Sequence, residues 1–390
     1  MKKVVITHAF RTPIGSFNGA LSTLSAAQLG SIVIQKIVSE SGIDPMMIDE
    51  VIMGNVLTGG AGQAPARQAA LFAGLPDKTE CLTINKMCGS GLKAVMLAAQ
   101  AISAGDADVV IAGGQESMST APYVIPQGRN GYRYGHGQIL DTVLLDGLWD
   151  VYTNQHMGSC AEVCATNFSL TREAVDDFAV ASYQRALAAQ QEGRFNDEIV
   201  PVVLKSKTGD TVVSMDEEPA KVKFDKIPTL RPAFQKDGVI TAANASKLND
   251  GAAAVLVMSE QKAKELGFTP LAEIVSQASA AKQPVDFTIA PAESISKALT
   301  KASLNTDDID LYEINEAFAV VSLANNSLLK LDPAKVNVNG GAVALGHPIG
   351  ASGARVLVTL LHEMKRRSST YGVASLCIGG GEASALVVKR

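Results

Sequence analysis

The chain has 390 residues, of which 47% are hydrophobic and 19% are charged, and its formal net charge at pH 7 is −5. A chain of this length can bury a large core and form about two or three domains. The acidic balance gives no general electrostatic attraction to nucleic acid or to an anionic membrane, so we expect neither as a partner.

The N-terminal sequence MKKVVITHAF contains an apolar stretch that is too short for a secretory signal, and it runs directly into RTP. No apolar run approaches the ~18–20 residues of a membrane span. The five cysteines include no CxxC pair, and an odd number in a large chain does not indicate a disulfide framework. These observations predict a soluble, cytoplasmic protein.

Apolar runs predict the strands in chain order. In the first part of the chain they are VVITHAF (4–10), EVIMGNV (50–56), CLTIN (81–85) and DVVIAGG (108–114). In the last part they are PLAEIV (270–275), DLYEIN (310–315), KVNVNGG (335–341) and GVASLCIGGG (372–381). These runs are apolar on both faces, as expected for a sheet covered by helices on two sides.

Two helices are predicted by apolar stripes at helical spacing. The first, after residue 88, carries Leu92, Val95, Met96, Ala99 and Ile102 on one face. The second carries Leu357, Leu360, Leu361 and Met364, and it ends in three basic residues that suit the negative end of the helix dipole.

The chain also contains an internal repeat. The stretch KIVSESGIDPMMIDEVIMGNV, from Lys36, matches KALTKASLNTDDIDLYEINEA, from Lys297, at a constant offset that places Asp49 on Asp310. Further along, CGSGLKAV matches GASGARVL with the register shifted by one residue. We infer that a whole domain has been duplicated.

Residues 120–248 differ in character from both halves. They hold PQGRNGYRYGHG, a charged helix near TREAVDDFAVASYQRALAAQQEG and the charged loop MDEEPAKVKFDK. A long insertion on a duplicated scaffold is a candidate ligand-binding cap. We therefore divide the chain into a first half (1–119, completed by about 249–270), an inserted loop domain (120–248) and a second half (271–390).

The candidate chemistry begins at Cys88, which stands between a predicted strand and a predicted helix. Free backbone N–H groups and the helix dipole favour a thiolate there, although a buried structural cysteine is an equal alternative. His347, Cys377 and Asn315 follow or end predicted elements of the second half, where open α/β sheets place ligands. A cysteine paired with a histidine forms an activated nucleophile. Taken singly, each of the three also has a structural interpretation: His347 as a structural histidine, Cys377 as a core residue and Asn315 as a cap at the end of a strand.

Several long motifs are spread over the whole chain: NKMCGSGLKAV, AGGQESMS, HMGSCAE, NASKLNDGAAA, NEAF, GHPIGASGAR and CIGGG. With these motifs the sequence resembles the thiolase family over its full length, and most closely its short-chain acetyl-CoA acetyltransferase branch. The resemblance implies duplicated βαβαβαββ halves in a layered α/β arrangement. It also implies a homo-oligomer, either a dimer or a dimer of dimers.

The resemblance implies a role for each candidate. Cys88 would attack a thioester and carry the acetyl group, and His347 would take the thiol proton. Cys377 would act as acid or base at the α-carbon of a second acetyl-CoA. Asn315, through a water, and His347 would form one oxyanion site, and the backbone N–H groups of Cys88 and Gly379 would form the other. The reaction would join two acetyl-CoA into acetoacetyl-CoA and CoA, reversibly and by ping-pong kinetics.

A further set would bind the coenzyme A arm, which needs an apolar slot with a few polar stops. It consists of Leu148, His156, Met157, Lys221, Phe234, Ala242, Ser246, Ala317 and Phe318. Lys221 would hold a phosphate as a point charge, or it is a solvated surface lysine. Phe287 would line the acyl pocket.

No cofactor is required by the resemblance, but a potassium ion is an open alternative. Some members that carry phenylalanine at the position of Phe287 accept 2-methyl-branched acyl groups and bind this ion nearby. The residues that match its site, mostly through backbone carbonyls, are Tyr183, Ala242, Ala243, Ala245 and Val343. The helical spacing of His156, Cys160 and Cys164 also suggests a metal face, but the sequence shows no fourth ligand.

The sequence departs from the family's glycine-rich CIGGGQG at Glu382 and Ala383. Glu382 would raise the pKa of Cys377 if it pointed inward, or it is solvated. Three other functions remain open. They are a broader-range 3-ketoacyl-CoA thiolase, a decarboxylating ketoacyl synthase, in which a second histidine would replace the CIGGG cysteine, and a non-catalytic CoA- or lipid-binding protein.

Overall fold

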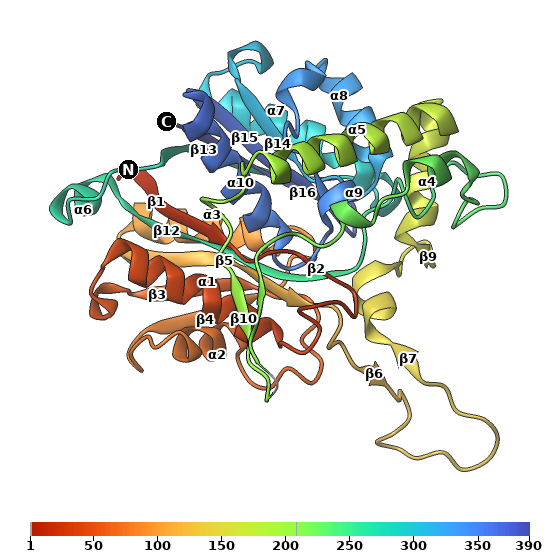
Figure 1. The fold of residues 1–390 in the computed structure, drawn as a ribbon, viewed down its shortest axis with the longest axis horizontal. Coiled ribbons are helices and arrows are strands. Elements are labelled where there is room, and N and C mark those ends of the chain that lie inside the picture. The colour runs from red at the N-terminus through yellow and green to blue at the C-terminus, as the bar shows by residue number, and fades with distance from the viewer. Residues whose placement is uncertain (1, 208) are drawn as a thin grey trace.

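The computed structural model describes residues 2–207 and 209–390, and its two halves lie one above the other, with the N-terminal half in red and orange and the C-terminal half in blue (Figure 1). The strands of the first half are β1 (Val4–Arg11), β2 (Gly15–Ser16), β3 (Glu50–Gly54), β4 (Glu80–Ile84), β5 (Val109–Ser117) and β12 (Asn249–Ser259). Those of the second half are β13 (Ala272–Ala281), β14 (Leu311–Ile314), β15 (Tyr371–Ile378) and β16 (Glu382–Lys389).

The strands form one mixed sheet in the order β14-β15-β16-β13-β1-β12-β5-β3-β4, and β2 pairs with β12. The halves join where β1 and β13 pair over only two residue pairs, Val5 with Glu273 and Ile6 with Ala272. The outer pairs of each half are parallel: β4 with β3 and β3 with β5 in the first half, and β14 with β15 in the second. The next pairs toward the middle of the sheet, β12 with β5 and β15 with β16, are antiparallel.

The helices form layers around this sheet. Those of the first half are α1 (Ala26–Ser41), α2 (Pro65–Phe72), α3 (Ser90–Ala104) and α6 (Glu260–Glu265), with a 3₁₀ turn η1 (Pro45–Met47). Those of the second half are α7 (Ala290–Ala302), α8 (Ala319–Leu329), α9 (Ala342–Leu345) and α10 (Ser352–Arg367), with 3₁₀ turns η5 (Pro284–Ile289), η6 (Thr306–Asp308) and η7 (Pro333–Lys335). The predicted stripes on α3 and α10 pack together in the central core, α1 and α2 cover the first-half strands, and α7 covers the second-half strands.

The duplication is visible in side chains that the repeat matched. Asp49 accepts the backbone N–H groups of residues 108 and 109, at the start of β5 (2.8 and 2.9 Å). Its counterpart Asp310 accepts those of residues 370 and 371, at the start of β15 (2.7 and 3.0 Å). Each aspartate thus fixes the beginning of the strand beside it in its own half.

The two central helices cross at matched glycines. A Cβ on Gly91 would lie 2.7 Å from the backbone nitrogen of Ala354, and one on Gly353 would lie 2.3 Å from that of Leu92. Only glycine allows the two backbones to approach this closely. The contact brings the N-terminal ends of α3 and α10 together, and the segments that precede these ends carry Cys88 and His347.

Two sequence predictions about elements are wrong. KVNVNGG does not form a strand: the structure has η7 followed by a single parallel bridge between Tyr312 and Val336. The outermost position of the second half therefore holds one bridge where the first half has β4. The second wrong prediction is that no apolar run approaches the length of a membrane span. By length and composition alone, Met87–Ala104 is long and apolar enough to cross a membrane, with a mean hydropathy of 1.2. This segment contains α3, whose buried face lies in the central core.

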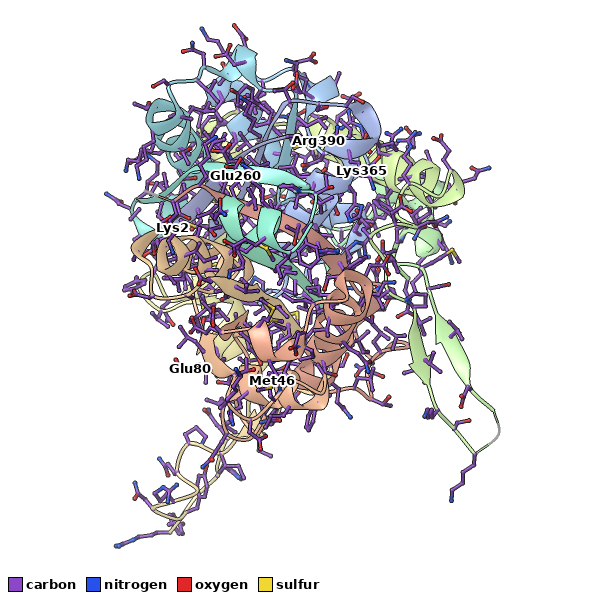
Figure 2. All side chains as sticks on the ribbon, turned by 90° about the vertical axis from the view of Figure 1, so that its left-hand side faces the viewer. Lys2, Met46, Glu80, Glu260, Lys365 and Arg390 are labelled. Atoms are coloured by element: carbon purple, nitrogen blue, oxygen red, sulfur yellow. The ribbon has the colours of Figure 1, made fainter. Side chains whose placement is uncertain are left out.

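The insertion contains small elements and two longer helices. They are β6 (Tyr123–Val124), β7 (Leu140–Asp141), the π-helix η2 (Val143–Leu148), β8 (Trp149–Asp150), β9 (Gln155–His156), α4 (Met157–Asn167), α5 (Arg172–Gln191), β10 (Val202–Leu204), β11 (Thr211–Val213), η3 (Pro219–Lys221) and η4 (Phe224–Thr229). Figure 2 shows the loop between β6 and β7 and the β10–β11 hairpin as two extensions from the body. The domain boundaries drawn from the sequence stay a prediction.

Candidate active site

Cys88 lies in a tight turn between β4 and α3. The Oγ of Ser90 accepts a hydrogen bond from the backbone N–H of Lys86 (2.9 Å) and donates one to the carbonyl oxygen of Met87 (2.6 Å). Met87 has a φ of +47°, a strained conformation for a residue with a side chain. A Cβ on Gly89 would lie 2.3 Å from a side chain of β15. The turn is therefore held from within and from the opposite half, and it delivers Cys88 directly before α3.

The thiol of Cys88 is not a ready thiolate. Burial raises its pKa to about 11, although the backbone N–H groups of Gly379 and of Cys88 itself donate hydrogen bonds to the sulfur and lower it. The carboxylate of Glu116 adds a smaller increase. The expectation that the helix N-terminus makes Cys88 a thiolate is therefore wrong, because loss of water outweighs the helix dipole. Cys88 needs a base to become a nucleophile.

His347 follows α9 and is fixed through its backbone and one ring nitrogen. Its N–H donates to Oδ1 of Asn249 (2.9 Å), and its Nδ1 lies 2.6 Å from Oγ of Ser352. That hydroxyl donates its single hydrogen to the carbonyl oxygen of Pro348 (2.9 Å), so we assign the hydrogen of the shorter bond to Nδ1.

This assignment leaves Nε2 of His347 with a lone pair, and Nε2 has no hydrogen-bond partner among the described residues. Burial, and secondarily the charge of Arg355, lowers the pKa of His347 to about 3. The imidazole is therefore neutral at physiological pH and can accept a proton at Nε2.

Asn315 and Cys377 complete the group. Asn315 directly follows β14, and its Nδ2 lies 3.5 Å from Nδ1 of His347. Cys377 lies near the end of β15 and is buried. Its pKa is raised by burial and, secondarily, by the neighbouring thiol of Cys88, so it holds its proton at rest. The structure thus brings together all of the side chains that were predicted to be catalytic.

A cavity of about 260 Å³ opens over Cys88. Its wall is mostly apolar, with a few polar groups, and is formed by Cys88, Met118, Gly147, Leu148, His156, Met157, Phe234, Ala245, Ser246, Lys247, Leu248, Phe287, Ala317, Phe318, His347, Ile349 and Gly379. Seven of the nine residues implied for the coenzyme A arm line this cavity, as does Phe287. An apolar slot with convergent polar groups is typical of a small-molecule site.

Aromatic rings build one wall of the cavity. His156 stacks on Phe234 with ring centroids 4.7 Å apart, and Phe318 meets both Phe234 and Phe287 edge-on, at 6.3 and 6.4 Å. His156 also begins α4, where its Nδ1 accepts the backbone N–H of Gly158 (2.9 Å). Its ring is therefore engaged in stacking and capping, and the described residues contain no group of three potential metal ligands with Cys160 and Cys164.

Two residues implied for coenzyme A do not line the cavity. Lys221 contacts the hydroxyl of Ser16, and its Nζ lies 4.0 and 3.8 Å from the carboxylates of Glu217 and Glu218. These partners compensate its charge without a phosphate. Ala242 is exposed to solvent.

Glu382, the departure from the family motif, forms an ion pair with Lys86 across the two halves. It is therefore engaged with the turn before Cys88, and it is not among the groups that shift the pKa of Cys377.

Sequence reasoning missed three residues that hold the site. Ser352 and Asn249 fix His347, as described above. Glu116 is buried and joins the segment after β3 to the turn before α10: its carboxylate accepts the N–H groups of Val56 and Gly350, both at 2.9 Å. A signal was present for Ser352, because the repeat matches it with Ser90, which holds the turn of Cys88. Asn249 lies in the motif NASKLNDGAAA, and Glu116 lies in the motif AGGQESMS.

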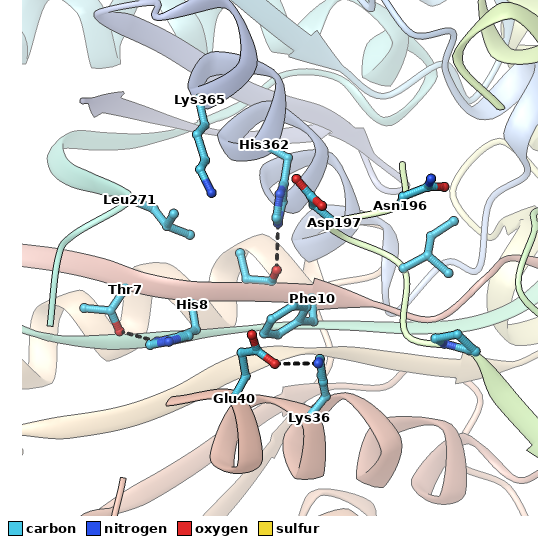
Figure 3. A pocket seen from close by; sticks show the side chains of 13 residues that line it. Thr7, His8, Phe10, Lys36, Glu40, Asn196, Asp197, Leu271, His362 and Lys365 are labelled. Atoms are coloured by element: carbon cyan, nitrogen blue, oxygen red, sulfur yellow. Dashed lines mark hydrogen bonds and ion pairs between the residues drawn. The ribbon is translucent and has the colours of Figure 1, made fainter. Parts of the chain in front are cut away.

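A larger cavity, of about 650 Å³, lies away from Cys88, between the end of α1, β1 and α10 (Figure 3). Three of its polar side chains already have partners: Lys36 pairs with Glu40 at 2.6 Å, and Nε2 of His362 bonds the carbonyl oxygen of Ala9 at 2.9 Å. None of the described residues that line it is a cysteine. It therefore offers no nucleophile of the kind found at Cys88.

A cysteine, a neutral histidine and backbone N–H donors around an apolar slot define a cysteine-dependent acyl-transfer site. The family models "Thiolase, N-terminal domain" and "Thiolase, C-terminal domain" match residues 4–261 and 268–390. The chain belongs to the thiolase family, and its fold is the duplicated, layered fold expected from the sequence.

Individual relatives match over the whole chain. An acetyl-CoA acetyltransferase of Cupriavidus necator is 55% identical, with both chains fully covered. The mitochondrial acetyl-CoA acetyltransferase of Bos taurus is 52% identical over all of this chain and 92% of its own. The crystal structure of the Bacillus anthracis acetyl-CoA acetyltransferase has a TM-score of 0.98 at 46% identity and covers 100% of this chain and 99% of its own. That of an Ascaris suum thiolase in complex with coenzyme A has a TM-score of 0.95 at 46% identity, with both chains fully covered.

Proposed function

We propose that the protein is an acetyl-CoA C-acetyltransferase, which joins two acetyl-CoA into acetoacetyl-CoA and CoA, or performs the reverse thiolysis. The observation that carries this proposal is the cavity lined by Cys88, Gly379 and His347, where the N–H of Gly379 donates to the Cys88 thiol and Nε2 of His347 has no hydrogen-bond partner among the described residues. The relatives named acetyl-CoA acetyltransferase, which match over the full chain, support the choice of substrate.

In the first half-reaction, Nε2 of His347 takes the proton of the Cys88 thiol, whose raised pKa makes a base necessary. The thiolate attacks the carbonyl carbon of acetyl-CoA, and the N–H groups of Cys88 and Gly379 receive the developing negative charge on the carbonyl oxygen. The C–S bond to coenzyme A then breaks. Cys377, which holds its proton at rest, donates it to the departing thiolate.

The second half-reaction uses the Cys377 thiolate and the protonated His347 that the first half-reaction leaves. The Cys377 thiolate takes an α-proton from a second acetyl-CoA, and the enolate oxygen is stabilised by His347 and, through a water, by Asn315. The α-carbon attacks the acetyl group, the bond to Cys88 breaks, and His347 returns the proton to the Cys88 thiolate. Acetoacetyl-CoA leaves, and all groups regain their initial protonation.

A broader-range 3-ketoacyl-CoA thiolase is the alternative. Phe287 and Met157 both line the cavity, and the space is small, which favours short acyl groups. Thiolysis rates for acetoacetyl-CoA, 2-methylacetoacetyl-CoA and 3-ketohexanoyl-CoA, measured side by side, test the proposal. The first substrate should be the fastest. Faster turnover of 3-ketohexanoyl-CoA would instead assign the broader range.

The protein is proposed to work as a homo-oligomer, a dimer or a dimer of dimers. The support is the sheet edge at β4, where Leu82 is 42% exposed on the last strand. An open apolar edge of this kind favours pairing with another chain. Light scattering after size exclusion tests this, and a monomeric mass at micromolar concentration would contradict it.

A further inference from the structure

Lys247 places its ammonium group between two segments that shape the site. Its Nζ donates hydrogen bonds to the carbonyl oxygens of Val343 (2.7 Å) and Ala245 (3.3 Å) and to the hydroxyl of Tyr183. Nζ also lies 4.8 Å from the centroid of the Tyr183 ring, within the range of a cation–π contact. All of these partners are neutral, so the group is held by dipoles and not by an ion pair.

Within residues 2–207 and 209–390, no carboxylate forms a salt bridge with Lys247. Burial lowers the pKa of Lys247 to about 8, and the more distant carboxylates of Glu218 and Glu316 oppose this. Burial and the same two carboxylates raise the pKa of Tyr183, which therefore stays a neutral phenol. At pH 7 the Lys247 amine is consequently a cation.

The oxygens around this cation are those expected for a potassium ion. Tyr183, Ala245 and Val343 belong to the five residues that match the family's ion site, and all three contact Nζ of Lys247. An ion placed among them would lie beside the ammonium group, and two positive charges this close in a buried place repel each other strongly. The residues of this chain therefore do not fit a potassium ion.

The contacts of Lys247 reach the catalytic base through the backbone. Val343 lies in α9, the single helical turn that leads to His347, and its N–H donates to Oε2 of Glu316 (3.2 Å). The two peptide groups on either side of Val343 are thus held between the carboxylate of Glu316 and the ammonium group of Lys247. On its other side, the loop of Lys247 continues to Asn249, whose Oδ1 accepts the N–H of His347 (2.9 Å).

We propose that the ammonium group of Lys247 is a built-in monovalent cation, which joins the loop at 245–249 to α9 and makes the enzyme independent of potassium. Lys247 is a positioning residue, because it acts on His347 through the backbone. The expected effect on catalysis rests on the proposed function. The replacement of the ion by a side chain is tested without turnover, through the thermal unfolding midpoint.

The test compares potassium chloride with tetramethylammonium chloride at equal ionic strength. For the wild type, the thermal unfolding midpoint and the kcat of acetoacetyl-CoA thiolysis should be the same in both salts. In Lys247→Ala, kcat should fall ~10- to 100-fold in tetramethylammonium chloride, because the base is less well placed. Potassium chloride should raise its unfolding midpoint and restore much of its kcat, with KM little changed.

Two further variants sharpen the result. Lys301 is the matched control: its Nζ donates to the carbonyl oxygen of Gln277 (2.9 Å) at an exposed position on α7, so Lys301→Ala should show no response to the salt. Lys247→Gln fills the same space without charge, so its kcat should fall and potassium should not rescue it.

A rise in the wild-type midpoint or kcat with potassium would overturn the proposal, as would a Lys247→Ala variant that ignores the ion in both measurements. If Lys247→Ala does not fold, the glutamine variant decides, since wild-type kcat in it would show that the charge is not needed. A protein without thiolase activity, whose Lys247→Ala variant still gains stability from potassium, would refute the function but keep the cation site.

Discussion

Replacing Ser352 by alanine tests how the base is oriented. The Oγ of Ser352 lies 2.6 Å from Nδ1 of His347 and accepts its hydrogen. In Ser352→Ala this buried N–H loses its partner, at a cost of about 1–3 kcal/mol. If this energy is lost from the transition state of acyl transfer, the rate falls by about 5- to 150-fold, because 1.36 kcal/mol corresponds to a tenfold change.

The assay is a single-turnover transfer of labelled acetyl from acetyl-CoA to the protein, which isolates the first half-reaction. The matched control is Ser322→Ala on α8, since the Oγ of Ser322 is also buried but has no hydrogen-bond partner among the described residues. The control should load acetyl at the wild-type rate. Equal rates in Ser352→Ala and the wild type, or equal losses in both variants, would refute the assigned role of Ser352.

Three further outcomes are expected. Cys377→Ala should still load acetyl in that assay, more slowly, but should fail in condensation, because nothing removes the α-proton; equal losses in both half-reactions would contradict its role. The folded-state pKa of His347, about 3, lies below its unfolded value of 6.5, so the unfolded chain binds a proton that the folded chain refuses as the pH falls through this interval. Urea unfolding should show that His347→Asn loses less stability on acidification than the wild type, by about 1.4 kcal/mol per pH unit below 6.5, and equal losses would show that His347 is protonated in the fold. Gly353→Ala should lower the free energy of unfolding by roughly 1–3 kcal/mol, because its Cβ would lie 2.3 Å from a backbone nitrogen of α3; unchanged stability in urea would contradict the close crossing.

The sequence predicted the centre of the site because its residues belong to long motifs at the ends of repeated elements. Cys88 and His347 precede the matched helices α3 and α10, and the matched glycines bring these helix ends together. Pairing across the halves, as between Lys86 and Glu382, depends on side-chain contacts that no local pattern encodes. The prediction of a thiolate at Cys88 is wrong for a related reason, because the desolvation that raises the pKa of this thiol comes from segments distant in the sequence.

The peripheral residues were less predictable from sequence. Lys221 is on a charged loop, where a lysine can meet a phosphate or its own neighbours, and the structure places it beside Glu217 and Glu218. Lys247 stands inside a quoted motif, but only the fold shows that its ammonium group reaches Val343, which lies far along the chain. The strand expected at 335–341 was lost because only Val336 reaches its neighbour in the sheet.

The central claim is that Cys88 carries the acetyl group between two coenzyme A molecules. The most direct measurement is peptide mapping after brief incubation with radiolabelled acetyl-CoA and acid quenching, on the wild type and on Cys88→Ser. We expect label on the peptide that contains Cys88 in the wild type and none in the variant. Label on Cys377 or on another residue in the wild type, or label that persists in Cys88→Ser, would contradict it.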